Sequence, residues 1–325
     1  MNYCIHRESW STRSPFRITG VEFNEFCNVV VEIGDNDSLG RGEALGIFYL
    51  DDTPSGMVEK LEQLRPRIEA GLDRVALQTL RPPGGARNAL DCALWDLEAK
   101  KTGKSIWQLT EVEPKTLETA YTIGIEPTPE AMASRASNAA DYELLKVKLD
   151  GYQPVERMEA IRSARPTARI VVDANQGWSL QQLKEIAPVF AELGVEMIEQ
   201  PLPRGQDEGL EHYRSPIPLC ADESCLHLGE LEQARHRYQM INIKLDKTGG
   251  LTEALALAER ARDFDLGLMV GCMGGTSLAM APAFVVGCLC DLVDIDGPLL
   301  LRNDRPTGLN YDKGMVKPFD ANVWG

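Results

Sequence analysis

The sequence predicts an α/β protein in two parts, a parallel β/α barrel and an α+β lobe that precedes it. After about residue 115 the chain carries eight short apolar segments with helical patterns between them, and parallel strands joined by helical crossovers close into a barrel. The first hundred residues differ, because their apolar residues alternate as in antiparallel strands. We assign residues 113–298 to the barrel and residues 1–112 to the lobe.

The lobe is expected to be an antiparallel meander followed by helices. Alternation in FRITGVEFNEF and NVVVEIGD predicts strands, GDNDSLGRGEA is rich in turn residues, and helical patterns cover residues 54–73 and 84–101. In the second helix three leucines share one face and two aspartates lie off it, so we expect this helix to pack on one side only. These residues are Leu90, Leu94 and Leu97, and Asp91 and Asp96.

The barrel segment contains clear helix signals. Thr128 followed by Pro129 is typical of a helix start, and Ser179 opens a helical stretch that ends before Gly194. A barrel over 117–298 is short for an architecture that usually takes roughly 200 residues or more, so at least one helix should be brief or missing. The Pro- and Gly-rich tail, 299–325, is expected to return to the lobe and make the domains discontinuous. The predicted strands are LETAYTIGI, LLKVKLD, RIVVDAN, VEMIEQP, PLCADES, MINIKLD, GLMVGCM and LVDIDGP.

Composition and charge limit the classes of partner. The 325 residues carry a net charge of −15, whereas nucleic acid or an anionic membrane would require a basic face, so neither is expected. The sequence contains no apolar core of signal-peptide length at its start and no uncharged stretch able to span a bilayer, so we expect a cytoplasmic protein. The eight cysteines form no pair of CxxC motifs, which predicts buried, reduced thiols.

Six charged residues at the ends of the apolar segments indicate the chemistry. From Lys148 the successive steps are 25, 26, 23 and 22 residues, about one strand plus one helix each, so every charge falls at a strand's carboxyl end, where barrel active sites gather. The six are Lys146, Lys148, Asp173, Glu199, Asp222 and Lys244. Side chains two apart on a strand share a side, so three pairs should face inward together: Lys146 with Lys148, Asp173 with Asn175, and Lys244 with Asp246.

Three carboxylates placed together imply a cation. An unpaired buried charge costs several kcal/mol, so Asp173, Glu199 and Asp222 are expected to share a metal ion. Oxygen ligands favour Mg²⁺, with Mn²⁺ as the alternative, and three such ligands leave positions for a substrate carboxylate. The sequence therefore predicts one divalent ion per subunit.

The lysines suit removal of a proton from the carbon beside that carboxylate. The resulting enediolate is stable only if a metal and nearby cations neutralise its charge. Lys146 beside Lys148 disfavours protonation of both, so one amine is expected to act as a base near neutral pH. Lys148 and Lys244 come from the second and sixth strands, on opposite sides of the ring, and two bases across a planar intermediate invert a stereocentre. Racemisation or epimerisation follows.

The motifs KVKLD, DANQGW, IEQP, ADES and NIKLDKTGG resemble the enolase superfamily, in its muconate-lactonising-enzyme subgroup, over nearly the whole chain. This resemblance implies a capping α+β domain on a modified (β/α)₇β barrel. It also implies Mg²⁺ on Asp173, Glu199 and Asp222, with Lys148 and Lys244 as the acid/base pair and Lys146 supporting the base. A homo-oligomer is the expected assembly, with a subunit number that the sequence does not give.

Within the subgroup, LVDIDGP is similar to the D-x-D pair by which dipeptide epimerases hold the substrate's ammonium group, here Asp294 and Asp296. Two inward carboxylates make a good site for a cation. Arg17 in SPFRITG resembles the arginine that would receive a side-chain carboxylate, the alternative being a surface arginine. The expected substrate is Ala-Glu or a relative of it.

Further residues are expected around this site. Gly274, Thr276 or Ser277 in GCMGGTSLAM could contact a peptide, or the segment could be only a tight turn into a buried helix. Asn175 and Gln200 should orient carboxylates rather than bind the metal. Three other charged residues should complete a charge network, namely Glu223, Asp246 and Lys247.

Three other functions remain open on the sequence. The first is racemisation of N-acylamino acids by the same lysines, which would not need the D-x-D pair. The second is a lyase of the same subgroup, such as an o-succinylbenzoate synthase or a cycloisomerase, and the third is a non-catalytic metal-binding protein. No histidine stands at the end of the sixth or seventh predicted strand, which argues against mandelate-racemase or sugar-acid dehydratase chemistry.

Overall fold

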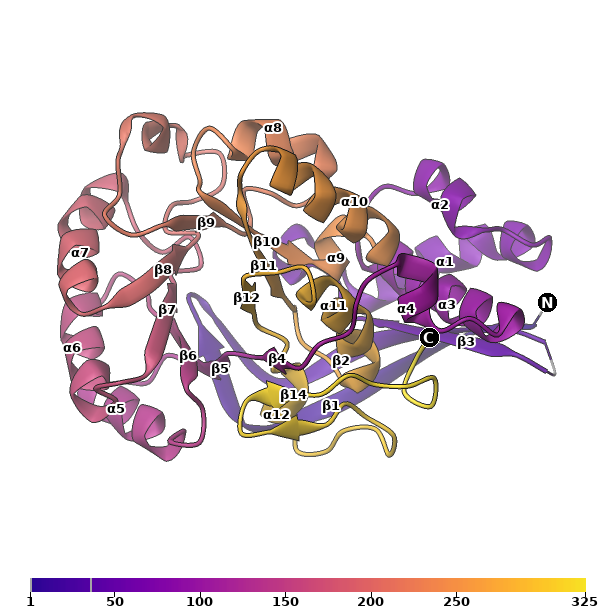
Figure 1. The fold of residues 1–325 in the computed structure, drawn as a ribbon, viewed down its shortest axis with the longest axis horizontal. Helices are drawn as coiled ribbons and strands as arrows, with labels where there is room; N and C mark the ends of the chain where they lie inside the picture. Colours follow the sequence, from indigo (N-terminus) through magenta and orange to yellow (C-terminus); the bar gives the residue numbers. More distant parts are fainter. Residues whose placement is uncertain (1, 36) are drawn as a thin grey trace.

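The computed structural model describes residues 2–35 and 37–325 and has the two predicted parts (Figure 1). The first lobe holds an antiparallel sheet in the order β1-β2-β3. Its strands are β1 (Asn2–Ile18), β2 (Val21–Gly34) and β3 (Leu39–Ala44). β1 begins well before the predicted strand, because its polar first half gains its conformation from pairing with β2 rather than from an apolar pattern.

Helices cover the sheet of the first lobe. The elements are η1 (Phe48–Leu50), α1 (Pro54–Glu69), α2 (Arg74–Leu80), α3 (Gly85–Thr102) and α4 (Ile106–Thr110). Thr53 caps α1 by accepting a hydrogen bond from the Gly56 amide, and Pro54 occupies the first turn of this helix.

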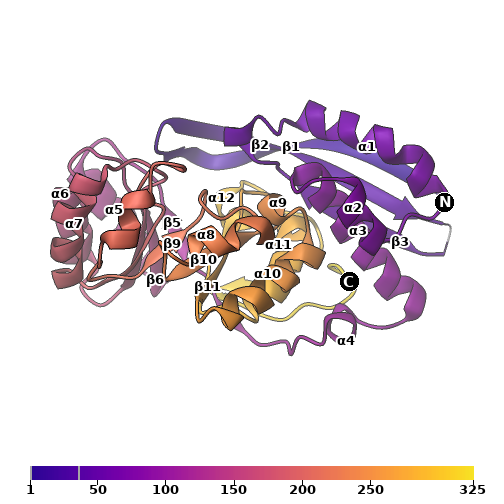
Figure 2. The ribbon, with the colours of Figure 1, turned by 90° about the horizontal axis from the view of Figure 1, so that it is seen from above.

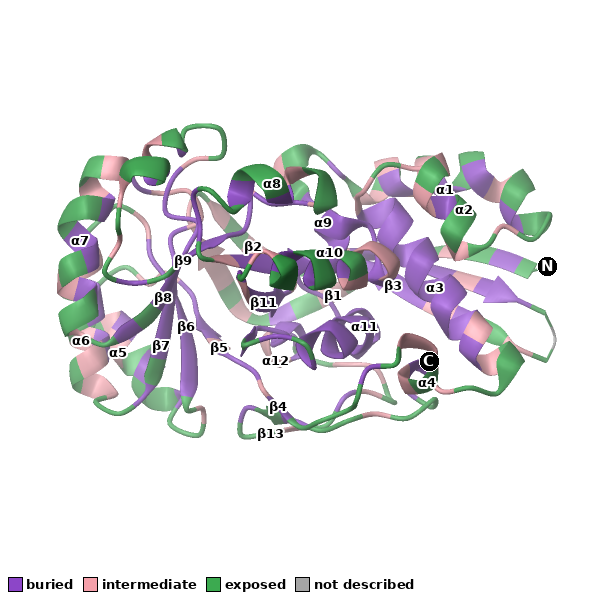
Figure 3. Ribbon diagram, turned by 45° about the horizontal axis from the view of Figure 1, so that its top comes forward, coloured by how far each residue is buried: buried purple, intermediate pink, exposed green. Residues whose placement is uncertain are grey.

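Helix α3 packs on both sides, so the prediction of one-sided packing was wrong (Figure 3). Its leucine face lies on the first lobe's sheet, and its opposite side meets the barrel. There the buried Asp91 accepts a hydrogen bond from the Thr252 amide, at 3.0 Å. The buried Asp96 accepts from the amides of Arg41, at 2.7 Å, and Gly325, at 2.8 Å. These acids therefore join α3 to distant segments rather than facing solvent.

The second part is an eight-stranded parallel sheet that curls into a barrel, in the order β12-β11-β10-β9-β8-β7-β6-β5. The Ala120 amide donates to the Val293 carbonyl at 2.8 Å and joins the two ends of the sheet. All eight predicted strands are confirmed. They are β5 (Tyr121–Ile123), β6 (Leu144–Lys148), β7 (Arg169–Asp173), β8 (Val195–Glu199), β9 (Leu219–Ala221), β10 (Met240–Lys244), β11 (Gly267–Gly271) and β12 (Leu292–Val293).

Helices surround the barrel strands, and some connections are short, as expected. Thr128 and Ser179 cap their helices as predicted, the latter in a capping box with Gln182. A single turn, η2 (Glu208–His212), follows β8, and η3 (Leu228–Glu230) with α8 (Leu231–Ala234) follows β9. The other helices are α5 (Pro129–Asn138), α6 (Pro154–Ala164), α7 (Leu180–Glu192), α9 (Leu245–Thr248), α10 (Leu251–Asp263) and α11 (Ser277–Gly287).

The first predicted barrel strand is split in the structure. Its beginning forms β4 (Leu117–Glu118), which pairs with β14 (Met315–Val316) and through it with β13 (Tyr311–Asp312). After α12 (Gly297–Leu300) the tail runs on to the first lobe. There the Trp324 indole donates to the Arg41 carbonyl at 2.9 Å. Residue 2, where β1 begins, and the carboxyl-terminal residue 325 therefore both lie at the first lobe (Figure 1).

The β1–β2 hairpin reaches from the first lobe over the barrel strands (Figure 2). At its tip the Thr19 hydroxyl donates to the Ala174 carbonyl, directly after β7, at 3.0 Å. The Ile125 amide, after β5, donates to the Arg17 carbonyl at 2.9 Å. These contacts fix the hairpin over the carboxyl ends of the strands.

The cysteines are all free thiols, and five of the eight are buried. Cys4 is exposed, which differs from the expectation, because it lies on the outer face of β1. Across residues 2–35 and 37–325, no helix has both the length and the apolar character needed to traverse a bilayer.

Candidate active site

Charged side chains form one layer inside the barrel, above an apolar plug. The plug consists of buried residues that stand two positions before polar ones on the strands, and side chains two positions apart point to the same side. Its members include Leu144, Val171, Met197, Cys220 and Leu292. The residues above them are Lys146, Asp173, Glu199, Asp222 and Asp294, all buried. The charges therefore meet a closed barrel below and a cavity above.

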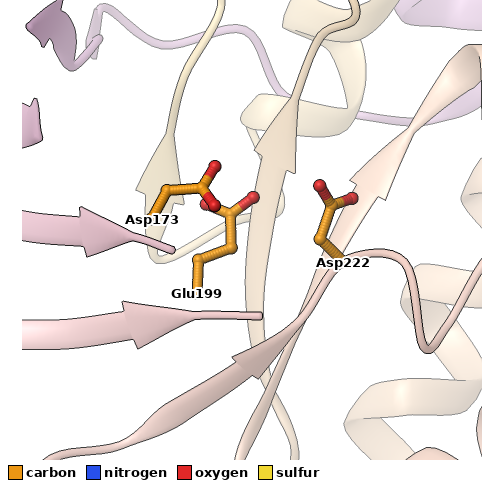
Figure 4. A group of neighbouring side chains, drawn as sticks. All are labelled: Asp173, Glu199 and Asp222. Carbon is orange, nitrogen blue, oxygen red and sulfur yellow. The ribbon is translucent and has the colours of Figure 1, made fainter. Parts of the chain in front are cut away.

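Three carboxylates converge in this layer (Figure 4). Asp173 ends β7, Glu199 ends β8 and Asp222 follows β9, and one oxygen from each lies within 4.8 Å of the others. All three residues are fully buried. An all-carboxylate set of this size fits Mg²⁺ or Mn²⁺, which prefer hard oxygen ligands.

The first flank of the carboxylates carries two lysines from β6. Lys148 places its Nζ 2.5 Å from Asp173 Oδ2. Lys146 Nζ lies 3.2 Å from the same oxygen, 2.7 Å from Glu199 Oε2 and 2.8 Å from Asp294 Oδ2. Lys146 is thus surrounded by three carboxylates.

The second flank carries two lysines on Asp222. Lys244, at the end of β10, lies 2.6 Å from Asp222 Oδ2, and Lys247 lies 2.7 Å from Oδ1. Lys247 also donates to the backbone carbonyls of Asp222, Cys225 and Asn242. Because β7, β8 and β9 lie between β6 and β10 in the sheet, the carboxylates stand between Lys148 and Lys244.

The electrostatic balance of this layer follows from burial and pairing. Burial alone would raise the pKa of Asp173, but Lys148 and Lys146 outweigh it and lower this pKa to about 2. Burial, and then Asp173, raise the pKa of Glu199 to about 7. Burial alone would lower the pKa of Lys146, but Asp294, Glu199 and Asp173 outweigh it and hold this pKa well above its usual value.

The expectation that one amine acts as a base concerns the site with its metal ion, and it stays a prediction. Lys146 is a cation that compensates these carboxylates, because attraction to Asp294, Glu199 and Asp173 exceeds the effect of burial on its pKa. A divalent cation among the carboxylates would take over that compensation and lower lysine pKa values.

Asp294 and Asp296 line the same cavity. Strand β12 ends at Val293, so both lie in the segment after the strand rather than on it. Asp296 Oδ2 accepts from the Thr122 amide at 2.7 Å, and burial, then Asp294, raise the pKa of Asp296 to about 7. Asp294 Oδ1 is buried without a hydrogen-bond partner. This pair can accept hydrogen bonds from a cationic group.

The loop after β11 is anchored by the first lobe. Gly274 lines the cavity with φ of +135°, and a Cβ there would lie 3.0 Å from the Phe26 ring, so close packing requires glycine. Thr276 and Ser277, for which substrate contact was one of two expectations, are not among the residues that line the cavity. Their side chains are buried and bonded to Glu43 and Asp304.

Arg17 also lies outside the cavity wall. It is on β1 between Phe16 and Ile18, which line the cavity, and alternation along the strand sends its side chain the other way. Its Nε donates to Glu22 Oε2 at 2.5 Å, with both side chains about two-fifths exposed, at 43% and 40%. In this structure Arg17 is a partly exposed surface arginine.

Of the two predicted orienting residues, Gln200 holds the backbone beside Asp222 and Asn175 bonds the Asp173 carboxylate through its backbone amide. Gln200 Oε1 accepts from the amides of Asp222 and Ser224, at 3.0 Å each. The Asn175 amide donates to Asp173 Oδ1 at 2.9 Å, and its buried side-chain oxygen faces the cavity without a hydrogen-bond partner.

Of the three residues expected to complete a charge network, two lie at the charged layer and one lies elsewhere. Lys247 and Glu223 belong to the charged layer or its edge, and burial, then Asp222, raise the pKa of Glu223 to about 8. Asp246 does not point inward with Lys244, because the chain enters α9 directly after β10. Its carboxylate instead accepts from the Gly46 amide of the first lobe at 2.8 Å.

Sequence reasoning missed two groups. Asn242, two positions before Lys244, donates to Glu199 Oε1 at 2.8 Å, and the strand periodicity that placed Lys244 could have identified it. An aromatic cluster of the first lobe lines the cavity opposite the charges, and no local pattern indicated its place. It comprises Phe23, Phe26, Phe48 and Tyr49. None of the four histidines lines the cavity.

The fold and site define a two-lobed barrel enzyme of the enolase type. Residues 2–110 match the mandelate racemase/muconate lactonizing enzyme N-terminal domain, and residues 130–321 match the enolase C-terminal domain-like family. The chain belongs to the mandelate racemase/muconate lactonizing enzyme family of the enolase superfamily.

Individual relatives resemble the chain over almost its whole length. The L-Ala-D/L-Glu epimerase of Escherichia coli K12 is 42% identical over 95% of this chain and 97% of its own. The N-acetyl-D-glutamate racemase of a Pseudoalteromonas species is 40% identical over 91% of this chain and 95% of its own. A solved Agrobacterium tumefaciens enolase-family protein with homology to dipeptide epimerases, containing sodium and L-Ala-L-Glu, is 40% identical with a TM-score of 0.97, covering 99% of each chain.

Proposed function

We propose that the protein is a Mg²⁺-dependent epimerase that inverts the α-carbon beside the carboxylate of a dipeptide, Ala-Glu or a relative of it. The observation that carries this proposal is a buried set of three carboxylates between two cavity-lining lysines, Lys148 and Lys244. Mn²⁺ is the alternative ion. The Escherichia coli relative supports a dipeptide substrate.

The metal site would consist of Asp173, Glu199 and Asp222, one ion per subunit. Bound Mg²⁺ would withdraw charge from the substrate carboxylate and make the adjacent α-proton more acidic. Asn175, Gln200 and Asn242 would hold the three carboxylates in place.

The lysines would move the proton. Lys148 Nζ would accept the α-proton on one face, and Lys244 Nζ would return a proton to the opposite face, with the roles reversed for the other stereoisomer. Lys146, which has three carboxylates around it, would tune the charge of Lys148 and help to hold the enediolate.

The dipeptide's amino terminus would bind at Asp294 and Asp296. Asp294 Oδ1 is buried, faces the cavity and has no hydrogen-bond partner, so an ammonium group would satisfy it. Gly274 would border the peptide. We do not assign substrate contact to Thr276, Ser277 or Arg17, because other groups hold their side chains.

Residues 1–112, completed by 299–325, would act as a capping domain on the barrel of residues 113–298. The contacts of Arg41 with Trp324 and of Thr19 with Ala174 support a lobe held over the cavity. A cytoplasmic location and a homo-oligomeric state, without nucleic-acid or membrane partners, complete the proposal.

A second candidate is an N-acylamino acid racemase, which the Pseudoalteromonas relative favours. Both activities use the same lysines and metal, and they differ in the group bound by the Asp294–Asp296 pair. A free ammonium matches this pair, whereas an acylated amine brings no cation to Asp294 Oδ1, the oxygen of Asp294 that lacks a partner.

The test is α-proton exchange in D₂O. The enzyme with Mg²⁺ is incubated with L-Ala-L-Glu, L-Ala-D-Glu and N-acetyl-L-Glu, and deuterium at the α-carbon is followed by mass and NMR. We expect exchange and inversion with both dipeptides, loss of both on chelation, and much slower reaction of the acylated compound. Faster reaction of the acylated compound would favour the racemase, and an absence of exchange from all three would contradict this assignment.

A further inference from the structure

The cavity has two unlike walls. The barrel contributes a charged floor, which includes Lys148, Lys244, Asp294 and Asp296. The first lobe contributes an apolar roof, which we define as Phe16, Ile18, Phe23, Phe26, Phe48 and Tyr49. A substrate held between these walls would place its ionic groups at the charged floor and its remaining atoms against the apolar side chains of the roof.

The roof is a connected aromatic surface. The ring centroid of Phe23 lies 5.5 Å from that of Phe26 and 5.3 Å from that of Phe48, which lies 5.2 Å from that of Tyr49. These rings come from the β1–β2 hairpin and from the segment after β3, and the Phe23–Phe48 contact joins the two parts at the cavity. Phe48 remains 38% exposed, so the cluster is not fully covered by protein.

The roof offers no cation to a substrate. Among the described residues that line the cavity, the cations are Lys146, Lys148 and Lys244, all on the floor and all paired with carboxylates. The nearest arginine along β1, Arg17, pairs with Glu22 on the other side of the strand. A side-chain carboxylate under the roof would therefore be desolvated without a partner.

The proposed reaction directs the substrate's side chain to the roof. The α-carbon becomes planar, so its three substituents lie in one plane while the lysines take the two faces. One substituent, the carboxylate, lies at the acids of β7 to β9, and the second, the peptide nitrogen, leads to the aspartates after β12. The third substituent, the side chain, would then point away from the charged floor and toward Phe23 and Phe48 of the roof.

We propose, on the basis of the function proposed above, that the residue epimerised by this enzyme has an apolar side chain, aliphatic or aromatic, which packs against the roof. An acidic side chain is a poorer substrate, because burial without a partner penalises a charge while apolar contact favours binding. Phe23 and Phe48 are the residues that determine this preference.

The experiment compares kcat/KM for L-Ala-L-Leu, L-Ala-L-Phe and L-Ala-L-Glu by α-deuterium exchange on the intact enzyme with Mg²⁺. We expect the leucyl and phenylalanyl dipeptides to exceed the glutamyl one by about tenfold or more. The reverse order would overturn this inference and leave the epimerase function standing. Exchange with none of the three would contradict both, so the two failures are distinguishable.

Two substitutions test the residues. Phe23→Arg, and independently the more exposed Phe48→Arg, should raise the ratio of Ala-Glu to Ala-Leu turnover by about tenfold or more, since each adds a cation to the roof. Val75→Arg adds the same charge to α2, where residue 75 is 67% exposed and outside the cavity, and should leave the ratio unchanged. An unchanged ratio in both roof variants, or the same rise in the Val75 control, would overturn the assignment.

Discussion

The two flanks of the charged layer are alike in one lysine and different in the other. Lys148 and Lys244 each face the cavity and pair with one aspartate. Beside Lys148, Lys146 also lines the cavity and is bound by three carboxylates. Beside Lys244, Lys247 lies outside the cavity wall and is bound by one carboxylate and three backbone carbonyls. The fold therefore holds Lys247, while Lys146 depends on the charges that a metal ion would engage.

This difference separates two uses of a buried lysine. A lysine on backbone carbonyls shapes the chain around it, here the approach to α9 and the position of Asp222. A lysine among carboxylates is coupled to whatever else binds those carboxylates. We infer that Lys146 has an electrostatic role in the reaction and that Lys247 has a structural one.

The largest effect should come from removing either cavity-facing lysine. Lys148→Ala and Lys244→Ala should each reduce epimerisation by about 10³-fold or more, because inversion requires a proton acceptor and a donor on opposite faces. Circular dichroism of both stereoisomers over time measures the rate. A loss below tenfold in one variant would make the flanks unequal and remove that lysine from the pair.

The next effect should distinguish Lys146 from Lys247. Lys247→Met should lower the free energy of unfolding by about 3–5 kcal/mol, because it leaves Asp222 Oδ1 and three buried carbonyls without their donor. Lys146→Met should lose less stability when Mg²⁺ is present, since the ion compensates the same acids, yet its kcat should fall by about 10²-fold. Denaturant unfolding with and without Mg²⁺ measures both, and equal responses to Mg²⁺ would contradict the distinction.

A smaller effect should come from the carboxylate that both second-flank lysines share. Asp222→Asn keeps an oxygen acceptor for Lys247 but loses a charged ligand, so Mg²⁺ affinity should fall by about 10–100-fold while the fold is retained. Calorimetric titration with Mg²⁺ is the measurement, and Asp312→Asn, a change at an exposed position outside the cavity, is the control. Unchanged affinity would remove Asp222 from the metal site.

The smallest effect should come from Asp246, which follows Lys244 but faces the first lobe. Burial raises its pKa to about 6, so the native state binds a proton more readily than the unfolded state and stability falls as pH rises through this range. Asp246→Asn should remove this loss, which is about 1 kcal/mol between pH 5 and pH 7. Unfolding curves at the two pH values test it, and an identical pH dependence of both proteins would argue against the assignment.

The charged layer could be predicted from the sequence because it depends on local rules. Each charge ends an apolar segment at a spacing of one strand and one helix, and barrel closure then brings those ends together. Helix starts at Thr128 and Ser179 were predictable for the same reason, since a cap acts within one turn.

The rest depended on contacts that no local pattern encodes. Arg17 shares a strand with two cavity-lining residues, and only the register of β1 on β2 decides which side it faces. Asp91 and Asp96 resemble solvent-facing acids on α3, yet their partners are the backbone of residues 252, 41 and 325. Asp246 points away from the cavity because β10 ends at Lys244 and α9 begins at Leu245, so the alternation of a strand does not continue to residue 246.

The most direct test of two-sided proton transfer is the stereochemistry of exchange in the single-lysine variants. Each variant with Mg²⁺ is placed in D₂O with the L,L and the L,D form of one dipeptide, and α-deuteration is followed by NMR. We predict that Lys148→Ala exchanges one stereoisomer and Lys244→Ala only the other, because each retains an amine on one face. Exchange of the same stereoisomer by both variants, or of both stereoisomers by either, would contradict lysines on opposite faces.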